Sequence, residues 1–253
     1  MILDAFNLQG KVALVTGCDT GLGQGMTLGL AEAGCDIIGV NRKIPHDTAE
    51  KVQALGRRFT AIQADLSQPD VIPGLVEEAV ARMGRIDILV NNAGTIRRED
   101  ALEFSEKNWD EVMNLNIKSV FFLSQAVAKQ FIKQGSGGKI INIASMLSFQ
   151  GGIRVPSYTA SKSAVLGVTR LLANEWAQYN INVNAIAPGY MATDNTQQLR
   201  DDEARSKEIL DRIPAGRWGK PEDLQGAAVF LAASASDYIN GYTIAVDGGW
   251  LAR

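Results

Sequence analysis

The expected fold of this chain is indicated first by residues 11–34, KVALVTGCDTGLGQGMTLGLAEAG. A β-rich apolar run from Val12 to Val15 leads through a glycine-rich turn into a helical pattern. Glycines in such a turn permit positive φ angles and close approach of the backbone, and free N–H groups at a helix N-terminus favour a pyrophosphate. The spacing is T-G-x-x-x-G-x-G, which differs from the commonest dinucleotide fingerprint, G-x-G-x-x-G. The turn therefore suits either a dinucleotide or a tight bend that needs glycine for backbone reasons.

The rest of the chain repeats this alternation of strand and helix. Short apolar runs predict strands at 12–16, 36–40, 59–63, 86–90, 139–143, 181–186 and 243–246. Helical patterns lie between them at 22–33, 47–56, 70–83, 109–134, 157–178 and 221–233. Nearly continuous hydrophobicity is typical of strands buried on both faces of a parallel sheet. We therefore predict a doubly wound, Rossmann-type α/β fold with a seven-stranded parallel sheet and helices on both faces.

One segment breaks the rhythm. Residues 189–219 hold no strand pattern, are polar through TDNTQQLRDDEARSKE, and close with IPAGRWGKPED. A long interruption in a compact domain usually carries a function, so we expect a substrate loop or lid here. A solvated helical hairpin at 196–212 is the alternative.

Composition limits the class of protein. A chain of 253 residues, 46% of them hydrophobic, suits one domain spanning 1–253. The net charge of −3 and the absence of long basic runs argue against a nucleic-acid partner. Without a secretory pattern or about 18 consecutive apolar residues, we expect a cytoplasmic protein with no membrane partner. Cys18 and Cys35 lack metal-ligand neighbours, so we expect reduced packing residues and no metal site.

A second stretch, IINIASMLSFQGGIRVPSYTASK at 140–162, carries groups for hydride chemistry on a hydroxyl or a ketone. Tyr158 and Lys162 are four residues apart, which places both side chains on one face of a helix. The only histidine, His46, lies far from this stretch, so Tyr158 is the better candidate acid or base. A tyrosine needs its pKa of about 10 lowered by roughly two to three units to act near neutrality. Lys162 and a nicotinamide cation would supply that, while Ser145 would stabilise a developing alkoxide.

These motifs together resemble the short-chain dehydrogenase/reductase family, in the order and spacing of the family and over nearly the whole chain. The matching residues are Thr16-Gly17-Cys18-Asp19-Thr20-Gly21-Leu22-Gly23, Asp65, Asn91-Asn92-Ala93-Gly94, Asn116, Ser145, Tyr158, Lys162, Pro188-Gly189 and Thr193.

The resemblance implies roles for several of these residues. Asn116 would complete the catalytic set by holding a water that links Lys162 to solvent, and Lys162 would also bind the nicotinamide ribose. The turn residues Gly17, Asp19, Thr20, Gly21, Leu22 and Gly23 would hold the pyrophosphate side of the cofactor. The adenosine side would fall to Asp65, Leu66, Asn92, Ala93 and Gly94, and the nicotinamide side to Pro188, Gly189 and Thr193.

The choice of nicotinamide cofactor depends on the end of the second strand. An acidic residue there would bind the ribose hydroxyls and repel a 2′-phosphate, but this chain has Asn41-Arg42-Lys43. Arg42 fits a phosphate through its forked guanidinium, which favours NADP(H). The uronate-pathway enzymes that the chain resembles use NAD(H), and Asn41 is still able to bind ribose hydroxyls. We expect NAD(H), with NADP(H) possible through Arg42.

Within the family, residues 96–122 and 142–163 resemble members that act on deoxy and keto derivatives of gluconate in bacterial pectin and uronate breakdown. A sugar acid needs a cation for its carboxylate. Arg154, four residues before Tyr158, is the leading candidate, with Arg97 and Arg98 as others. Further candidates for the walls of the substrate pocket are Gln150, Tyr190, Met191 and Trp218.

Other functions remain open at this point. A reductase of another small ketone, such as a 3-oxoacyl thioester, would use the same catalytic residues. A non-catalytic dinucleotide sensor would not need Ser145, Tyr158 and Lys162 together, and a sugar-nucleotide epimerase would need a larger C-terminal region. The resemblance also implies a homotetramer, with the predicted helices 109–134 and 157–178 and the last strand at its interfaces.

Overall fold

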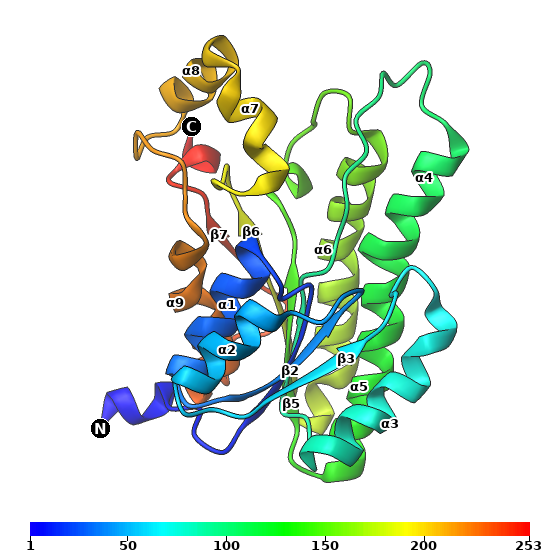
Figure 1. The fold of residues 1–253 in the computed structure, drawn as a ribbon, viewed down its shortest axis with the longest axis vertical. Coiled ribbons are helices and arrows are strands. Elements are labelled where there is room, and N and C mark those ends of the chain that lie inside the picture. Colours follow the sequence, from blue (N-terminus) through cyan, green and yellow to red (C-terminus); the bar gives the residue numbers. More distant parts are fainter.

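The computed structural model describes all 253 residues and contains one seven-stranded sheet (Figure 1). Every strand pair is parallel, and the strand order is β3-β2-β1-β4-β5-β6-β7. The strands are β1 Val12–Thr16, β2 Asp36–Asn41, β3 Phe59–Gln63, β4 Ile88–Asn91, β5 Gly138–Ile143, β6 Ile181–Pro188 and β7 Thr243–Val246. The predicted doubly wound fold is confirmed, with strand ends shifted by two residues at most.

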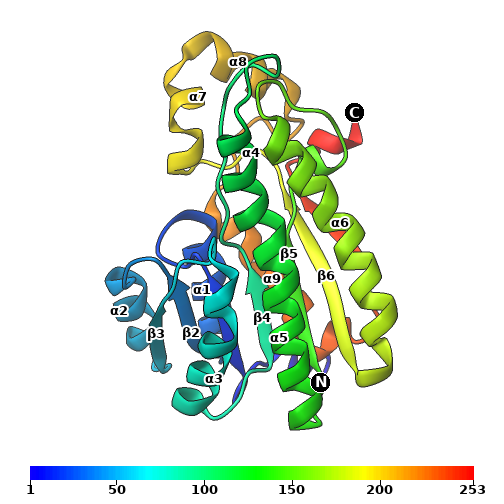
Figure 2. The ribbon, with the colours of Figure 1, turned by 90° about the vertical axis from the view of Figure 1, so that its right-hand side faces the viewer.

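Helices cover both faces of the sheet. The helices are α1 Gly21–Glu32, α2 His46–Ala54, α3 Ile72–Met83, α4 Glu106–Met113, α5 Ser119–Gln134, α6 Pro156–Trp176, α7 Gln197–Asp201, α8 Glu203–Arg212 and α9 Gln225–Ala232. Figures 1 and 2 show α1, α2 and α9 on one face and α3, α5 and α6 on the other. No helix combines the length and the apolar character that crossing a membrane requires.

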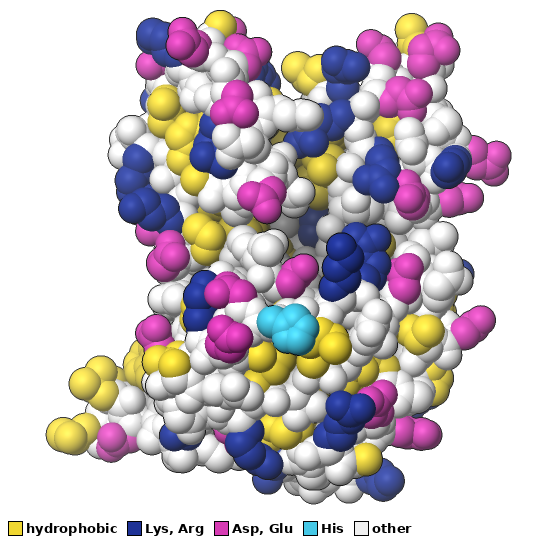
Figure 3. All heavy atoms as spheres, viewed as in Figure 1, with side chains coloured by type: hydrophobic (Ala, Val, Ile, Leu, Met, Phe, Trp, Pro, Cys, Tyr) yellow, Lys and Arg dark blue, Asp and Glu magenta, His cyan; other side chains and the backbone are white.

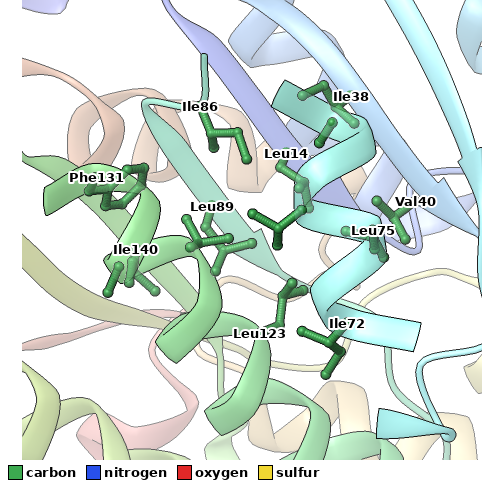
Figure 4. Packing of buried hydrophobic residues seen from close by; sticks show 14 of the residues in the cluster. Leu14, Ile38, Val40, Ile72, Leu75, Ile86, Leu89, Leu123, Phe131 and Ile140 are labelled. Carbon is green, nitrogen blue, oxygen red and sulfur yellow. The ribbon is translucent and has the colours of Figure 1, made fainter. Parts of the chain in front are cut away.

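Two hydrophobic layers result from the alternation of side chains along the buried strands. Leu14 and Ile38 point into a layer with α3, α5 and α6, part of which is shown in Figure 4. Val15 and Ile37 point the opposite way, into a layer with α1, α2 and α9. Each fully buried side chain of this kind contributes about 1.5–3 kcal/mol relative to an exposed one. This rigid sheet holds the loops at its carboxyl edge.

The predicted helix at 109–134 consists of α4 and α5 joined by a π-helical turn at Asn114–Lys118. It begins earlier than predicted because the Ser105 hydroxyl accepts a hydrogen bond from the Asn108 N–H at 3.3 Å and caps α4. It ends at Gly135, whose φ of 70° suits glycine. The π turn places Asn116 inside the protein, and such turns are frequent at functional sites.

The segment 189–219 lies beyond the carboxyl ends of β6 and β7, where it forms α7 and α8 (Figures 1 and 2). The absence of a strand, predicted from the sequence, is confirmed: the only β contact is a single bridge between Met191 and Gly219. The underside of α8 packs Ile209 onto Met146 and Trp250. The C-terminal turn thus fastens this segment to the region just after β5.

Candidate active site

The predicted motifs converge at the carboxyl edge of the sheet. β1 pairs with β2 on one side and with β4 on the other, so the strand order changes direction there. Open α/β sheets bind their ligands outside such a switch point. Figure 3 shows this face hollowed above its middle, between the part formed by α7 and α8 and the part formed by α4, with Lys and Arg at the rim.

The glycine turn after β1 is fixed by its backbone. Gly17 and Gly21 have φ angles of 64° and 53°, which only glycine adopts without strain. A Cβ at Gly23 would overlap the Gly17 carbonyl oxygen. The Asn92 amide donates to the carbonyl oxygens of Thr16 and Gly17 at 3.0 and 2.8 Å, so β4 holds the turn in place. Asp19 and Thr20 are exposed beside it, and Leu22 is half-buried in the first turn of α1.

The Thr16 hydroxyl joins the ends of β1 and β4. It accepts hydrogen bonds from the backbone N–H groups of Asn92 and Ala93 at 3.0 and 2.9 Å. Gly94 follows, close to Asn116: a Cβ at Gly94 would lie 3.3 Å from the Asn116 Oδ1 atom. Sequence analysis did not identify Thr16 as a link between strands, because its partners lie 76 and 77 residues away.

The end of β2 presents a polar group without a partner. Asn41 is buried and accepts a hydrogen bond from the Cys18 N–H at 2.9 Å, whereas its Nδ2 atom has no partner. Buried polar groups are usually hydrogen-bonded, so this donor fits a ligand hydroxyl beside the glycine turn. Arg42 is exposed and makes no ion pair. These residues, together with the turn that leaves no room for a Cβ, fit the adenosine end of a dinucleotide.

Asp65 and Leu66 follow β3 on the same edge. The Asp65 carboxylate accepts hydrogen bonds from the Ser67 hydroxyl and backbone N–H at 2.7 and 3.0 Å. The Ser67 hydroxyl, with a smaller contribution from Arg42, holds the pKa of Asp65 below its usual value. Leu66 is buried in the hydrophobic layer under α3, which leaves its backbone as the group that faces the site.

Ser145 lies two residues after the end of β5 and caps a short 3₁₀ turn at Met146–Ser148. Its hydroxyl oxygen accepts a hydrogen bond from the Leu147 N–H at 3.1 Å, which leaves the hydroxyl proton free to donate. The Ser145 N–H in turn donates to the Ser148 hydroxyl at 3.2 Å. Ser145 is buried, so its orientation is fixed before any ligand arrives.

Tyr158 and Lys162 share a face of α6, as predicted, with the Lys162 Nζ atom 5.7 Å from the centre of the Tyr158 ring. The ammonium donates to the Ile143 carbonyl oxygen at 2.5 Å, and its burial lowers the pKa of Lys162 to about 8. Burial also raises the pKa of Tyr158, against smaller lowering effects from the Ser145 hydroxyl and the charge of Arg98.

The protein alone therefore keeps the Tyr158 phenol protonated, which differs from the lowered pKa that the sequence argument required. The reason is physical: Lys162 directs its ammonium at a backbone oxygen, and burial of the ring outweighs the remaining favourable contacts. A bound oxidised nicotinamide would add a positive charge that lowers the pKa of Tyr158 further.

The side chain of Asn116 is fully used within the protein. Its amide donates to the Thr95 carbonyl oxygen at 2.9 Å and to the Ser161 hydroxyl at 3.2 Å, and its Oδ1 atom accepts from the Thr95 N–H at 2.8 Å. Ser161 belongs to α6, between Tyr158 and Lys162. Asn116 thus joins the π turn to the catalytic helix, and the predicted water relay stays a prediction.

The segment after β6 reaches back over the glycine turn. A Cβ at Gly21 would lie 3.4 Å from the Thr193 methyl group, although the two residues are far apart in sequence. Pro188 ends β6 and is buried, and Gly189 has no room for a Cβ because of Asp247. The structure therefore brings both ends of the expected cofactor site together.

The candidate carboxylate ligands differ in their surroundings. Arg97 is occupied by an ion pair with Glu111, whose Oε2 atom accepts from the Arg97 Nε atom at 2.7 Å. Arg98 has no acidic partner and donates to the Asn195 carbonyl oxygen at 3.1 Å, which links it to the segment before α7. Arg154 is exposed, has an unusual φ of 63°, and makes no side-chain hydrogen bond.

The proposed wall residues are divided between rim and core. Gln150 accepts from Arg212 of α8 at 3.2 Å, and the Arg212 guanidinium stacks 3.9 Å above the Trp250 ring. Tyr190 contacts the rings of both Trp218 and Trp250.

Met191 is only 4% exposed and packs into the core, and it also lines a small pocket beside Tyr190 and Gly219. No group of three or more His, Cys, Asp or Glu side chains is placed to bind a metal ion.

Comparison with known proteins agrees with this geometry. Residues 11–204 match the family model described as short chain dehydrogenase. A protein of Dickeya dadantii called 2-dehydro-3-deoxy-D-gluconate 5-dehydrogenase is 80% identical over 253 residues, which cover 100% of both chains. The protein of that name from Escherichia coli is 78% identical, again over 100% of both chains.

Solved structures show the same architecture. A gluconate 5-dehydrogenase from Burkholderia cenocepacia, in complex with NADP and tartrate, is 40% identical over 100% of both chains with a TM-score of 0.95. A structure from Agrobacterium tumefaciens with bound NADP is 54% identical with a TM-score of 0.94, over 99% of this chain and 100% of that one. The chain belongs to the short-chain dehydrogenase family, as an NAD(P)-dependent oxidoreductase that acts on CH–OH groups.

Proposed function

We propose that the enzyme interconverts a hydroxyl and a ketone on a deoxy or keto sugar acid, 2-dehydro-3-deoxy-D-gluconate or 2-deoxy-D-gluconate, in pectin and uronate breakdown. One observation carries the chemistry: Ser145, Tyr158 and Lys162 come together at the carboxyl edge of the sheet, the edge that also carries the glycine turn. The substrate class is supported by the full-length relatives at 80% and 78% identity.

The residues of this chain supply binding and proton transfer. A bound nicotinamide would accept or give the hydride. Tyr158 takes the hydroxyl proton during oxidation and returns it during reduction. The free proton of the Ser145 hydroxyl stabilises the developing alkoxide, and Lys162 holds positive charge on the same helix face.

For the cofactor, we propose that NAD(H) is preferred and NADP(H) is accepted. The unpartnered Asn41 Nδ2 atom suits a ribose hydroxyl, and the unpaired, exposed Arg42 leaves room and charge for a 2′-phosphate. We assign the pyrophosphate to the turn residues from Gly17 to Gly23. The remaining cofactor contacts go to Asp65, Leu66, Asn92, Ala93, Gly94, Lys162, Pro188, Gly189 and Thr193.

For the substrate, we propose that its carboxylate is bound by a cation at the rim of the hollow. Arg154 is the candidate predicted from the sequence, and it is exposed and unpaired. Arg98 has a structural argument of its own, because it spans from the loop after β4 to Asn195. Gln150 and Met191 remain the proposed neighbours of the substrate, with Ser145 and Tyr158 at the reacting carbon.

For assembly and location, we propose a cytoplasmic homotetramer that pairs α5 and α6 with their counterparts. Phe122 and Ile132 on α5 and Leu171 on α6 are exposed apolar side chains that such pairing would cover. Sedimentation of the purified protein distinguishes a tetramer from a monomer.

The test of function is a direct assay of purified enzyme with each cofactor and a panel of sugar acids, followed by the absorbance of the reduced nicotinamide. We expect the highest kcat/KM with a six-carbon deoxy or keto acid and NAD(H). Faster turnover of a 3-oxoacyl thioester than of any sugar acid would instead favour the competing reductase function.

A further inference from the structure

Ser148 connects the turn that carries Ser145 to the helix that carries Tyr158 and Lys162. None of the roles proposed above was given to Ser148. Its hydroxyl oxygen accepts a hydrogen bond from the Ser145 backbone N–H at 3.2 Å. The same hydroxyl donates its proton to the Lys162 carbonyl oxygen at 2.6 Å. A single hydroxyl thus spans from the loop after β5 to the middle of α6.

A second hydrogen bond between α6 and the end of β5 involves a charged group. Lys162 donates from its ammonium to the Ile143 carbonyl oxygen at 2.5 Å, but a bound nicotinamide ribose would compete for that ammonium. The Ser148 bridge uses backbone atoms at both ends, so it persists when the side chain of Lys162 turns to a ligand. It holds Ser145 against α6 in either case.

This position matters because Ser145 acts on Tyr158 across the gap. Interaction with the Ser145 hydroxyl lowers the pKa of the phenol and opposes the effect of burial. The Ser145 hydroxyl oxygen already accepts a hydrogen bond from the Leu147 N–H, which fixes its orientation. The distance from this hydroxyl to Tyr158 therefore depends on where the backbone of Ser145 lies relative to α6. Small displacements at such a contact are costly in rate.

We propose that Ser148 is a positioning residue that sets the distance between Ser145 and Tyr158 by bridging the Ser145 N–H to the Lys162 carbonyl oxygen. The proposal rests on the dehydrogenase function above. Another serine of α6 differs in this respect. The Ser161 hydroxyl donates to the backbone carbonyl oxygen of Tyr158 at 2.8 Å, within the same helix, and makes no link to Ser145.

The experiment compares Ser148→Ala with Ser148→Thr, which keeps a hydroxyl, and with Ser163→Ala on the exposed side of α6. For Ser148→Ala we expect kcat/KM for oxidation to fall roughly tenfold, because one partly buried hydrogen-bonded bridge is lost. The acidic limb of its pH profile should move to higher pH by roughly half a unit or more, since the phenolate loses support from Ser145. Dissociation constants for NAD(H) should stay within about twofold.

A purely structural role would give a different result. It would lower the melting temperature of Ser148→Ala and leave the pH limb of the folded enzyme at the parental value, and that outcome would overturn the proposal. Ser148→Thr should restore the limb, and Ser163→Ala should match the parent throughout. If Ser148→Ala does not fold, Ser148→Cys, a weaker donor, decides by the same shift. Inactivity of the parent on every sugar acid would refute the proposed substrate class and not this role.

Discussion

The loop after β1 and the segment after β6 meet at Gly21 and Thr193, yet they are built in different ways. The first is held by hydrogen bonds between side chains and backbone, from the Asn92 amide to the Thr16 and Gly17 carbonyl oxygens and from the Ala93 N–H to the Thr16 hydroxyl, and it leaves no room for a Cβ at Gly23. The second is held by backbone hydrogen bonds of Gly219 with Tyr190 and Ala192, and at its rim by the side chains of Arg98 and Arg212.

This contrast indicates which residues of the site are able to differ between related enzymes. A backbone cradle accepts one shape of ligand and tolerates few substitutions, so it suits a pyrophosphate that is common to all reactions. Side-chain contacts at the rim are replaceable one at a time, so they suit a substrate that differs between relatives. The candidate catalytic residues lie just after β5 and on α6, at the same edge of the sheet.

Tyr158→Phe should have the strongest effect, because it removes the proposed proton carrier. Turnover should fall by roughly 10² to 10⁴ or more, while cofactor binding to the β1 side stays within a few-fold. Steady-state rates and titration of the nicotinamide measure the two effects separately. Retention of a tenth of the parental rate would show that Tyr158 is not the proton carrier.

Gly23→Ala tests the backbone cradle alone. The added Cβ would overlap the Gly17 carbonyl oxygen and the Asn92 amide, so we expect a loss of about 3 kcal/mol in stability or an equivalent loss of cofactor affinity. Gly226→Ala in α9 is the matched control, since nothing lies within 4 Å of its Cβ and it should be neutral or stabilising. Thermal unfolding and cofactor titration of both variants decide; equal behaviour would contradict the close-contact argument.

The pH dependence of kcat/KM tests proton transfer by Tyr158. Burial raises the pKa of Tyr158, and the group is needed unprotonated for oxidation, so kcat/KM for oxidation should climb by up to about tenfold per pH unit above neutrality. The rise should flatten above pH 8, because Lys162, with a pKa of about 8, loses its charge there. Reduction needs the protonated phenol, so its rate should stay flat over this range and fall only as the pH approaches the raised pKa of Tyr158. A flat oxidation profile between pH 6 and 9 would argue against this assignment.

The rim should respond to charge removal with a change in KM. Loss of a charge-assisted contact costs about 1.5–3 kcal/mol, so removing the true carboxylate ligand should raise KM by roughly ten- to hundredfold with little change in kcat. Arg154→Ala and Arg98→Ala identify which cation it is, and Arg97→Ala controls for a cation already paired with Glu111. The ratio of kcat/KM for the acid and the matching uncharged sugar is the measurement. A ratio of one in the parent would eliminate carboxylate recognition altogether.

Arg42→Ala should have the smallest effect on the proposed physiological reaction. Its exposed guanidinium has no partner in the protein, so NAD(H) affinity should barely change. A grip on a 2′-phosphate would appear as a loss of roughly 1.5–3 kcal/mol in NADP(H) affinity alone. Parental preference for NADPH by more than tenfold would reverse the order of the two cofactors.

Much of the fold was predictable because it depends on local patterns. Buried parallel strands have continuous apolar runs, and Tyr158 and Lys162 reveal their shared face by spacing alone. The π turn at Asn114–Lys118 was not predictable, because one extra residue in a helix leaves no clear change in the hydrophobic pattern. The ionisation of Tyr158 was not predictable either, since it depends on how deeply the ring is buried and on where Lys162 points.

We could predict from the sequence alone the order of strands and helices along the chain, the glycine turn, and the shared helix face of Tyr158 and Lys162, because each depends on residues that are close together in the chain. Other features became visible only in the folded protein. Ser148 links the Ser145 N–H to the Lys162 carbonyl oxygen, and Arg98 donates to the Asn195 carbonyl oxygen. The Asn41 Nδ2 atom is left without a partner. The reason is the distance along the chain over which each interaction acts. Hydrophobic periodicity and turn chemistry act over a few residues, whereas these contacts join atoms that only the packing of the whole sheet brings within hydrogen-bonding distance.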